Sequence, residues 1–241
     1  MCSEAIPSDA RDCFGAAAPR NDGMKAILLT TTDGESLLDV NLSTATPWEA
    51  RPDWEYLRAR RGRMAANVRW IEELLAADAA RRSNGGLSNE SLLKGAGAGD
   101  IARIAQAGHA VAAAYRSCDH AALAAALAAL CGLGPGLTPA GDDWLAGWLL
   151  AHHCSEDLRG LRDLEGLIVE TAAARTTTLS RAFLAAAAAG EADESWHELL
   201  SALASEAANQ RISEAADVIL AHGATSGAAM LLGFVAGVDL W

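Results

Sequence analysis

The residues best suited to chemistry lie in one turn, Gly132-Leu-Gly-Pro-Gly-Leu-Thr-Pro-Ala-Gly-Asp-Asp143, directly before an apolar helix. A helix N-terminus leaves backbone N–H groups unpaired and carries a partial positive charge. Glycines let a ligand approach those groups because they have no Cβ. The turn therefore predicts a seat for a small anion, a phosphate or a carboxylate. The residues expected to form this seat are Gly134, Gly136, Leu137, Thr138 and Gly141.

Two adjacent carboxylates, Asp142 and Asp143, follow the glycines at the start of the helix. They suit the helix dipole but repel an anion in the same seat. We therefore expect them to meet a divalent metal, a substrate N–H group or a neighbouring arginine. Consecutive helical residues point about 100° apart, so only one of the two is expected to face the ligand. Our preference is Asp142, and both are catalytic candidates.

Two further segments place hydroxyl groups or glycines before an apolar helix: Arg175–Ser180 and His222–Gly227. In the first, Thr176 and Thr177 are candidate substrate-binding residues, and Arg175 can pair bidentately with a phosphate or carboxylate. In the second, Thr225 and Ser226 are binding candidates, and His222 is a candidate acid or base. Ordinary helix capping and a surface histidine are the alternative interpretations.

Several well-known site patterns are absent from the sequence. The P-loop pattern GxxxxGK[ST] does not occur, and the turn follows no clear strand, so a dinucleotide-binding fingerprint is excluded. Neither HExxH nor GxSxG is present. The five cysteines are scattered without zinc-like spacing, which is typical of reduced thiols. We therefore predict no metal-ligand set.

The overall composition favours an acidic, helical, cytoplasmic protein. Hydrophobic residues make up 51% of the chain but aromatics only 5%, so alanine and leucine dominate, and these favour helix. A net charge of -12 argues against binding nucleic acid or an anionic membrane surface. No secretory segment and no apolar run long enough to cross a membrane is found.

Periodicity predicts a mainly α (α+β) fold, a helical bundle with a small N-terminal β element. Residues 1–23 read as a variable N-terminus, and residues 24–47 as the β element, packed on the main domain, because Asp33-Gly34 separates two apolar runs. Residues 48–241 form the helical domain with the glycine-rich site. One long amphipathic helix is expected from Trp54 to Leu75, and one helical stretch over 101–130. Trp144 and Trp148 are expected in the core.

The turn, followed by Leu145 and Gly147, resembles the signature of the AllH-like family, which is associated with a subunit of oxamate carbamoyltransferase in allantoin catabolism. Two weaker blocks resemble the same family: Thr176–Leu184 with Ala189-Gly190, and Gly223–Gly227 with the segment 230–237. The resemblance covers roughly residues 125–241.

The resemblance implies a transferase that moves a carbamoyl group between carbamoyl phosphate and a small amide acid such as oxamate. The amides of residues 134–138 would hold phosphate, with hydroxyl bonds from Thr138 and Thr177 and charge from Arg175. Asp142 would orient or deprotonate the attacking amide. No cofactor is required, although Mg²⁺ is compatible with the site.

Two alternatives stay open: a hydrolase or lyase on a small amide or ureide acid, metal-assisted in one version, and a non-catalytic anion-binding subunit. The expected partners are a small anionic substrate and further subunits of a carbamoyltransferase. The small-residue helices are also compatible with an oligomer.

Overall fold

The computed structural model describes residues 26–30, 36–41, 48–84, 98–155, 158–206 and 209–241. The chain divides into two compact units, residues 1–50 and 51–241. The second unit is built from helices, which confirms the predicted mainly helical fold. Their bounds are α1 Trp54–Arg58, α2 Arg61–Asn67, α3 Arg69–Asn84, α5 Ala98–Arg116, α6 His120–Leu130, α7 Ala140–His153, α8 Leu158–Ala173, α9 Thr178–Ala188, α10 Glu194–Ala204, α11 Asn209–Leu220 and α12 Ser226–Val238. None of the helices in the described ranges is long and apolar enough to cross a membrane.

In the first unit, β1 (Ala26–Thr30) pairs antiparallel with β2 (Ser36–Asn41). Leu29 lies opposite Leu38, and the register is irregular between Leu29 and Thr30. The predicted variable segment 1–23 lies outside the described residues, as does the connection at residues 31–35. The packing of a β element on the helical domain stays a prediction.

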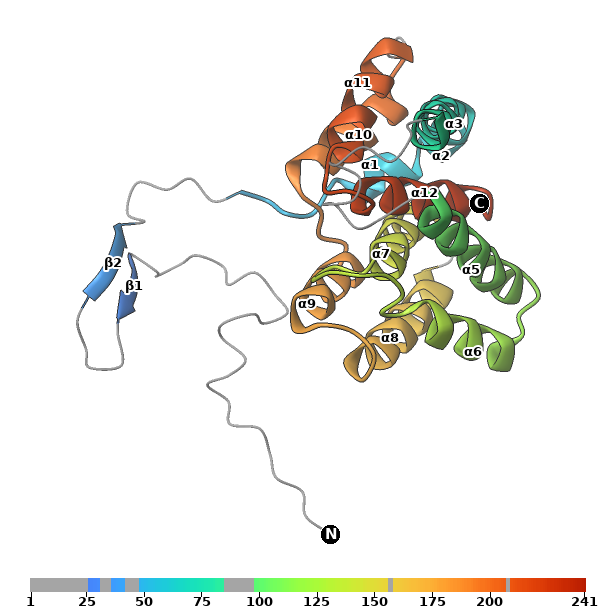
Figure 1. Ribbon diagram of the computed structural model, residues 1–241. Coiled ribbons are helices and arrows are strands. Elements are labelled where there is room, and N and C mark those ends of the chain that lie inside the picture. Colours follow the sequence, from blue (N-terminus) through green and yellow to red (C-terminus); the bar gives the residue numbers. More distant parts are fainter. Residues whose placement is uncertain (1–25, 31–35, 42–47, 85–97, 156–157, 207–208) are drawn as a thin grey trace. The chain divides into compact units, whose positions relative to one another are not determined.

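Helix α7 is the central element of the second unit, and every one of its residues is buried. It lies among α5, α8, α9 and α12 (Figure 1). Two glycines allow α7 and α12 to touch backbone to backbone. A Cβ on Gly147 would lie 1.9 Å from the Met230 carbonyl oxygen, and one on Gly233 would lie 1.9 Å from that of Trp144. The site at the start of α7 therefore rests on a tightly held helix.

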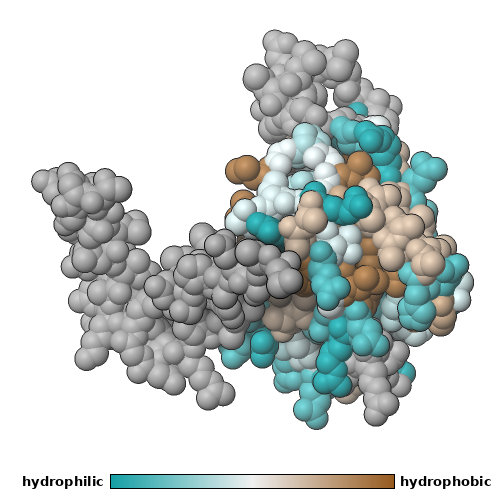
Figure 2. Space-filling view, turned by 90° about the horizontal axis from the view of Figure 1, so that it is seen from below, coloured by the Kyte–Doolittle hydropathy of each residue, from teal (hydrophilic) through white to brown (hydrophobic). Residues whose placement is uncertain are grey.

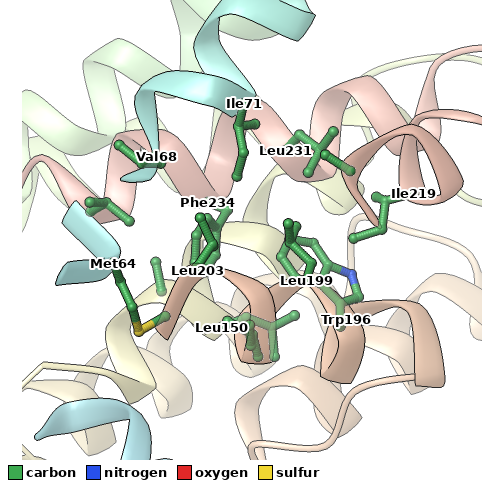
Figure 3. Packing of buried hydrophobic residues seen from close by; sticks show 14 of the residues in the cluster. Met64, Val68, Ile71, Leu150, Trp196, Leu199, Leu203, Ile219, Leu231 and Phe234 are labelled. Atoms are coloured by element: carbon green, nitrogen blue, oxygen red, sulfur yellow. The ribbon is translucent and has the colours of Figure 1, made fainter. Parts of the chain in front are cut away.

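Two apolar clusters flank this helix. One joins α2, α3, α10, α11 and α12, with Met64, Ile71, Trp196 and Phe234 facing one another in its interior (Figure 3). The other joins α5, α6, α8 and α9 around the first half of α7 and contains Trp144 and Trp148. Both tryptophans are fully enclosed, as predicted. The beginning of α7 is thus fixed by packing as well as by its own hydrogen bonds.

Two of the expected helices are interrupted. The predicted long helix from Trp54 is three helices, because turns intervene at residues 59–60 and at Val68. Its apolar face was correctly identified, since Leu57, Met64, Val68 and Ile71 are buried. The predicted stretch 101–130 is two helices, α5 and α6. The break occurs because Cys118 has a φ of 54° and the Asp119 side chain caps α6 by accepting from the Ala122 N–H.

Candidate functional site

The glycine-rich turn is shaped by left-handed backbone at Gly132, Gly134 and Gly136, whose φ angles are 74°, 119° and 99°. Glycine is the residue that adopts this region without strain. At Gly132 a Cβ would also lie 2.3 Å from the Arg175 carbonyl oxygen, so packing requires glycine there too. At Gly136 a Cβ would meet nothing within 4 Å. Gly136 therefore faces open space, where a ligand can approach the backbone.

A different glycine, Gly141, ties the turn to the helix. Its N–H donates to the Leu133 carbonyl over 2.8 Å. A Cβ at this position would lie 2.1 Å from the Leu130 carbonyl oxygen. Gly141 therefore serves the close packing of α7 against the end of α6, and its predicted part in binding a ligand is not supported by this geometry.

In the first aspartate, Asp142, both carboxylate oxygens accept hydrogen bonds from other groups of the protein. Its side chain is 1% exposed, and Oδ1 accepts from the Gly132 N–H at 2.8 Å. Oδ2 accepts from the hydroxyls of Thr176 and Ser180, the latter at 2.8 Å. These bonds join the turn to the start of α9. Asp142 is thus a positioning residue in this structure, and its predicted role as the ligand-facing carboxylate stays a prediction.

The second aspartate, Asp143, has the features expected of a reactive group. It is 4% exposed, and its Oδ2 has no hydrogen-bond partner within the described residues. Burial raises the pKa of this carboxyl to about 7; a hydrogen bond from Ser226 lowers the pKa and the charge of Asp142 raises it further. A carboxyl with such a pKa can take up or release a proton near neutral pH.

Three helix N-termini meet around this pair of aspartates. Ser226, at the start of α12, hydrogen-bonds to Asp143, and its hydroxyl lies 3.5 Å from that of Thr138. Thr177 caps α9 by accepting from the Ser180 N–H at 3.0 Å, and its own hydroxyl donates to the Leu137 carbonyl. The positive ends of α7, α9 and α12 are therefore directed to one place, which favours an anion there.

Unpaired backbone donors are available at this place. Within the described residues, the N–H groups of Gly136, Leu137 and Thr138 donate to no protein acceptor. The predicted binding residues Gly134, Gly136, Leu137, Thr138, Thr176, Thr177, Thr225 and Ser226 thus gather around one turn. Their binding of a ligand stays a prediction.

Arg175 and His222 are placed less directly. The Arg175 guanidinium donates to the Ala128 carbonyl at 3.0 Å, near the C-terminus of α6, so it stabilises that helix end. His222 lies half-buried between α11 and α12, and its backbone carbonyl accepts from the Gly227 N–H. Neither side chain contacts the two aspartates in the described structure. Their predicted roles lack geometric support.

Sequence reasoning overlooked Ser180 and two arginines. Arg103, on α5, lines a small hollow with Gly134 and Thr225, and it pairs with Asp100 at 3.6 Å. The hollow has a volume of about 10 Å³, room for roughly one water molecule. Arg82 donates to the Ala224 carbonyl at 2.6 Å and so holds the segment before α12. Both lie far from the turn in sequence, and no local pattern marks them.

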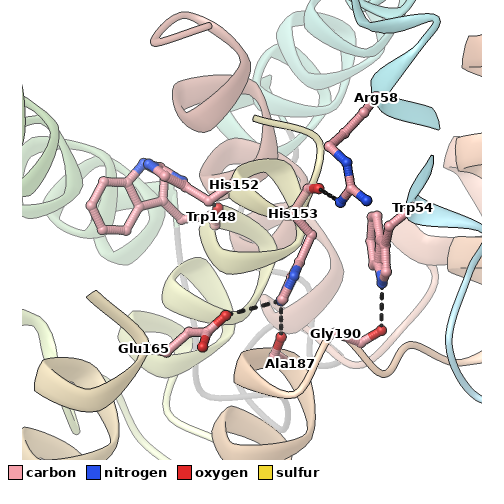
Figure 4. Close-up of polar contacts among 8 residues, drawn as sticks. All are labelled: Trp54, Arg58, Trp148, His152, His153, Glu165, Ala187 and Gly190. Carbon is pink, nitrogen blue, oxygen red and sulfur yellow. Dashed lines mark hydrogen bonds and ion pairs between the residues drawn. The ribbon is translucent and has the colours of Figure 1, made fainter. Parts of the chain in front are cut away.

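A second polar cluster lies at the other end of α7. Burial lowers the pKa of His152 to about 4, and its Nδ1 bonds to the Trp148 carbonyl at 2.9 Å. His153 stacks on Trp54 and bonds through Nε2 to the Ala187 carbonyl (Figure 4). Neutral, stacked and bonded to backbone, these histidines hold α7 in place. Within the described residues, no group of three or more His, Cys, Asp or Glu is arranged to hold a metal ion.

The comparisons with known proteins bear on the same part of the chain. Residues 130–238 match the family model described as oxamate carbamoyltransferase subunit AllH. The matched segment contains the turn, the start of α9 and the start of α12. Neither the comparison with curated proteins nor that with solved structures finds a match. The predicted resemblance to the AllH family is therefore confirmed for this segment.

Proposed function

We propose that this chain, with its AllH segment, is a subunit that transfers a carbamoyl group between carbamoyl phosphate and a small amide acid such as oxamate. The observation that carries the proposal is the position of Asp143. A buried carboxyl with an unpartnered oxygen lies where three helix N-termini meet. This combination supplies an acid–base group and an anion seat side by side.

The phosphate would bind at the exposed side of the turn. The free N–H groups of Gly136, Leu137 and Thr138 would donate to its oxygens, and the hydroxyls of Thr138 and Ser226 would add further bonds. The Thr177 hydroxyl holds this part of the turn by donating to the Leu137 carbonyl, which limits the reorganisation that the donors need during the reaction.

The chemical step would be an attack of the amide nitrogen of oxamate on the carbonyl carbon of carbamoyl phosphate. A new C–N bond forms, the C–O bond to phosphate breaks, and phosphate leaves with its electron pair. The attacking nitrogen loses a proton, which Asp143 would accept in its ionised form and return in the reverse direction. Asp142 would hold the turn against the start of α9 through its hydrogen bonds with Gly132, Thr176 and Ser180.

Completion of the site by a partner subunit is part of the proposal. The hollow beside the turn is too small to enclose carbamoyl phosphate. Large apolar side chains are exposed next to it: Leu137 is 72% exposed and, on α9, Leu179 and Phe183 are 40% and 51% exposed. Exposed apolar side chains beside an open site are typical of a protein interface. The family description, which names a subunit, agrees with this.

The test is ligand binding followed by turnover. The purified chain is melted with phosphate, carbamoyl phosphate, oxamate, oxalurate and Mg²⁺ in turn. A ligand present at about 100 times its Kd stabilises the folded chain by about 2.7 kcal/mol. We expect carbamoyl phosphate or phosphate to raise the melting temperature, and Thr138→Ala to reduce that rise.

Turnover is then measured with and without partner subunits, as carbamoyl phosphate formed from oxalurate and phosphate. Asp143→Asn is expected to lower turnover by about 10²-fold or more while phosphate still binds. Unchanged turnover in Asp143→Asn would refute the catalytic role. Stabilisation by Mg²⁺ alone would favour a metal-assisted hydrolase, and binding without turnover in the complete complex would leave an anion-binding subunit.

A further inference from the structure

The segment before α12 is held by a side chain of α3. Ala224 lies in the connection from α11 to α12, and its carbonyl accepts from Arg82 Nη1 at 2.6 Å. Helix α3 packs against both α11 and α12, so this bond joins neighbouring elements (Figure 1). The N-cap residue of α12, Thr225, makes no side-chain capping bond. The bond from Arg82 therefore helps to fix a helix start that has no side-chain cap.

Arg82 is itself fixed by an ion pair within its own helix. Its Nε donates to the Asp78 carboxylate, so one planar guanidinium bonds a carboxylate and the Ala224 carbonyl at the same time. On the face that Figure 2 shows, hydrophilic side chains lie on the open surface among hydrophobic ones. Asp78 and Arg82 differ, since their side chains are only 13% and 26% exposed. An arginine that is enclosed and bonded on two sides keeps one position, unlike a solvated surface arginine.

Two residues after Ala224, the Ser226 side chain reaches the carboxyl of Asp143. The hydrogen bond from Ser226 lowers the pKa of Asp143, whereas burial and the charge of Asp142 raise it. Among the described residues, Arg82 is not one of the groups that shift this pKa directly. Any effect of Arg82 on Asp143 therefore passes through the position of the Ser226 hydroxyl.

We propose that Arg82 is a positioning residue of the carbamoyl-transfer site, which holds the start of α12 so that the Ser226 hydroxyl stays on Asp143. Its part in turnover rests on the proposed function, whereas its effect on the Asp143 carboxyl does not. Without this anchor Ser226 withdraws, and the buried carboxylate loses a donor that stabilises its charge. Asp100 and Arg103, the charged pair of α5 in the hollow beside the turn, are untouched by the change.

The test follows the Asp143 carboxyl by ¹³C NMR while the full chain is titrated. In Arg82→Ala the pKa of this carboxyl should lie about one pH unit above the wild-type value, because a hydrogen bond to a charged group is lost. Arg81→Ala is the matched control, since Arg81 pairs with the same Asp78 carboxylate at 3.5 Å but is 62% exposed. It removes the same charge from the same helix and should leave the titration unchanged. Arg82→Lys keeps the charge without the planar fork and should raise the pKa by a smaller amount.

Turnover gives a second measurement in the complete complex. Formation of carbamoyl phosphate from oxalurate and phosphate would use protonated Asp143, so the pH above which its rate falls should rise by the same amount in Arg82→Ala. No turnover by the wild-type complex would refute the proposed function and leave the titration as the test of Arg82.

Circular dichroism checks that each variant is folded, and Arg82→Lys decides the question if Arg82→Ala does not fold. The inference is overturned if the Asp143 carboxyl titrates in the folded Arg82 variants as it does in the wild-type chain. It is also overturned if Arg81→Ala raises the pKa of Asp143 as much as Arg82→Ala, because loss of charge alone would then explain the change.

Discussion

The substitution Asp143→Asn tests whether the buried, ionised carboxylate of Asp143 destabilises the folded chain. The Asp143 side chain is 4% exposed and its Oδ2 lacks a partner. Asparagine has the same shape, keeps an oxygen that accepts from Ser226, and cannot ionise. The substitution therefore removes the charge with little change in packing.

The expected effect depends on pH, because burial raises the pKa of Asp143 from 3.8 to about 7. In the unfolded chain the carboxyl loses its proton near pH 4, while the folded chain keeps it up to about pH 7. Raising the pH from about 4 to about 7 thus lowers the stability of the folded chain. Above pH 7 the full cost of burying the charged Asp143 carboxylate remains. The difference in pKa corresponds to about 4 kcal/mol, and relaxation around the charge reduces the expected gain of Asp143→Asn to about 2 to 4 kcal/mol above neutral pH.

The assay is denaturant unfolding of both proteins at about pH 4 and about pH 8, with the midpoints compared at equal slope. Asp143→Asn should be more stable than wild type at the higher pH and close to it at the lower. Asp217→Asn, which removes an exposed carboxyl on α11, is the matched control. An equal effect at both pH values, or a loss of stability at the higher one, would refute the reasoning.

Three other predictions follow from the geometry. Asp142→Asn should destabilise the fold by about 2 kcal/mol in the same unfolding assay, because two hydroxyl donors lose their carboxylate acceptor; an increase in stability would show that those bonds are not formed. Gly147→Ala should destabilise the fold by about 3 kcal/mol, since its Cβ would lie 1.9 Å from the Met230 carbonyl oxygen. Gly166→Ala, in a helix with open space around it, should stabilise the fold by about 0.5 to 1 kcal/mol. Equal melting temperatures of these two variants would contradict the backbone contact at Gly147. Gly136→Ala, at a φ of 99°, should cost about 1 to 2 kcal/mol and weaken phosphate binding measured by calorimetry, and unchanged affinity would separate the turn from the anion site.

Local sequence was sufficient to locate the turn and most of the helices. Glycines and prolines specify backbone conformation over a few residues, and Gly132, Gly134 and Gly136 all adopt the left-handed region that the turn needs. Period-3.6 spacing identified the buried face of the first helices, although it did not reveal the breaks at residues 59–60 and at Val68. At residues 117–119 the interruption is visible afterwards in Asp119, which is a good N-cap.

The sequence did not reveal which of the two aspartates has both carboxylate oxygens engaged in hydrogen bonds and which has one oxygen without a partner. Which carboxylate is engaged depends on Thr176 and Ser180, which lie 34 and 38 residues further along the chain. The same limit applies to Arg103, which reaches the turn from another helix. Such contacts arise from tertiary packing, and periodicity within one segment carries no information about them.

The central claim is that Asp143 is an acid–base group inside an anion site, and a carboxyl titration tests it most directly. The chain is labelled with ¹³C at the aspartate carboxyl carbon, and the signal of Asp143 is assigned by its absence in Asp143→Asn. We predict a carboxyl that titrates near pH 7 and whose pKa rises when phosphate binds, because a neighbouring anion disfavours the charged form. A carboxyl that titrates near pH 4 and ignores phosphate would contradict the account.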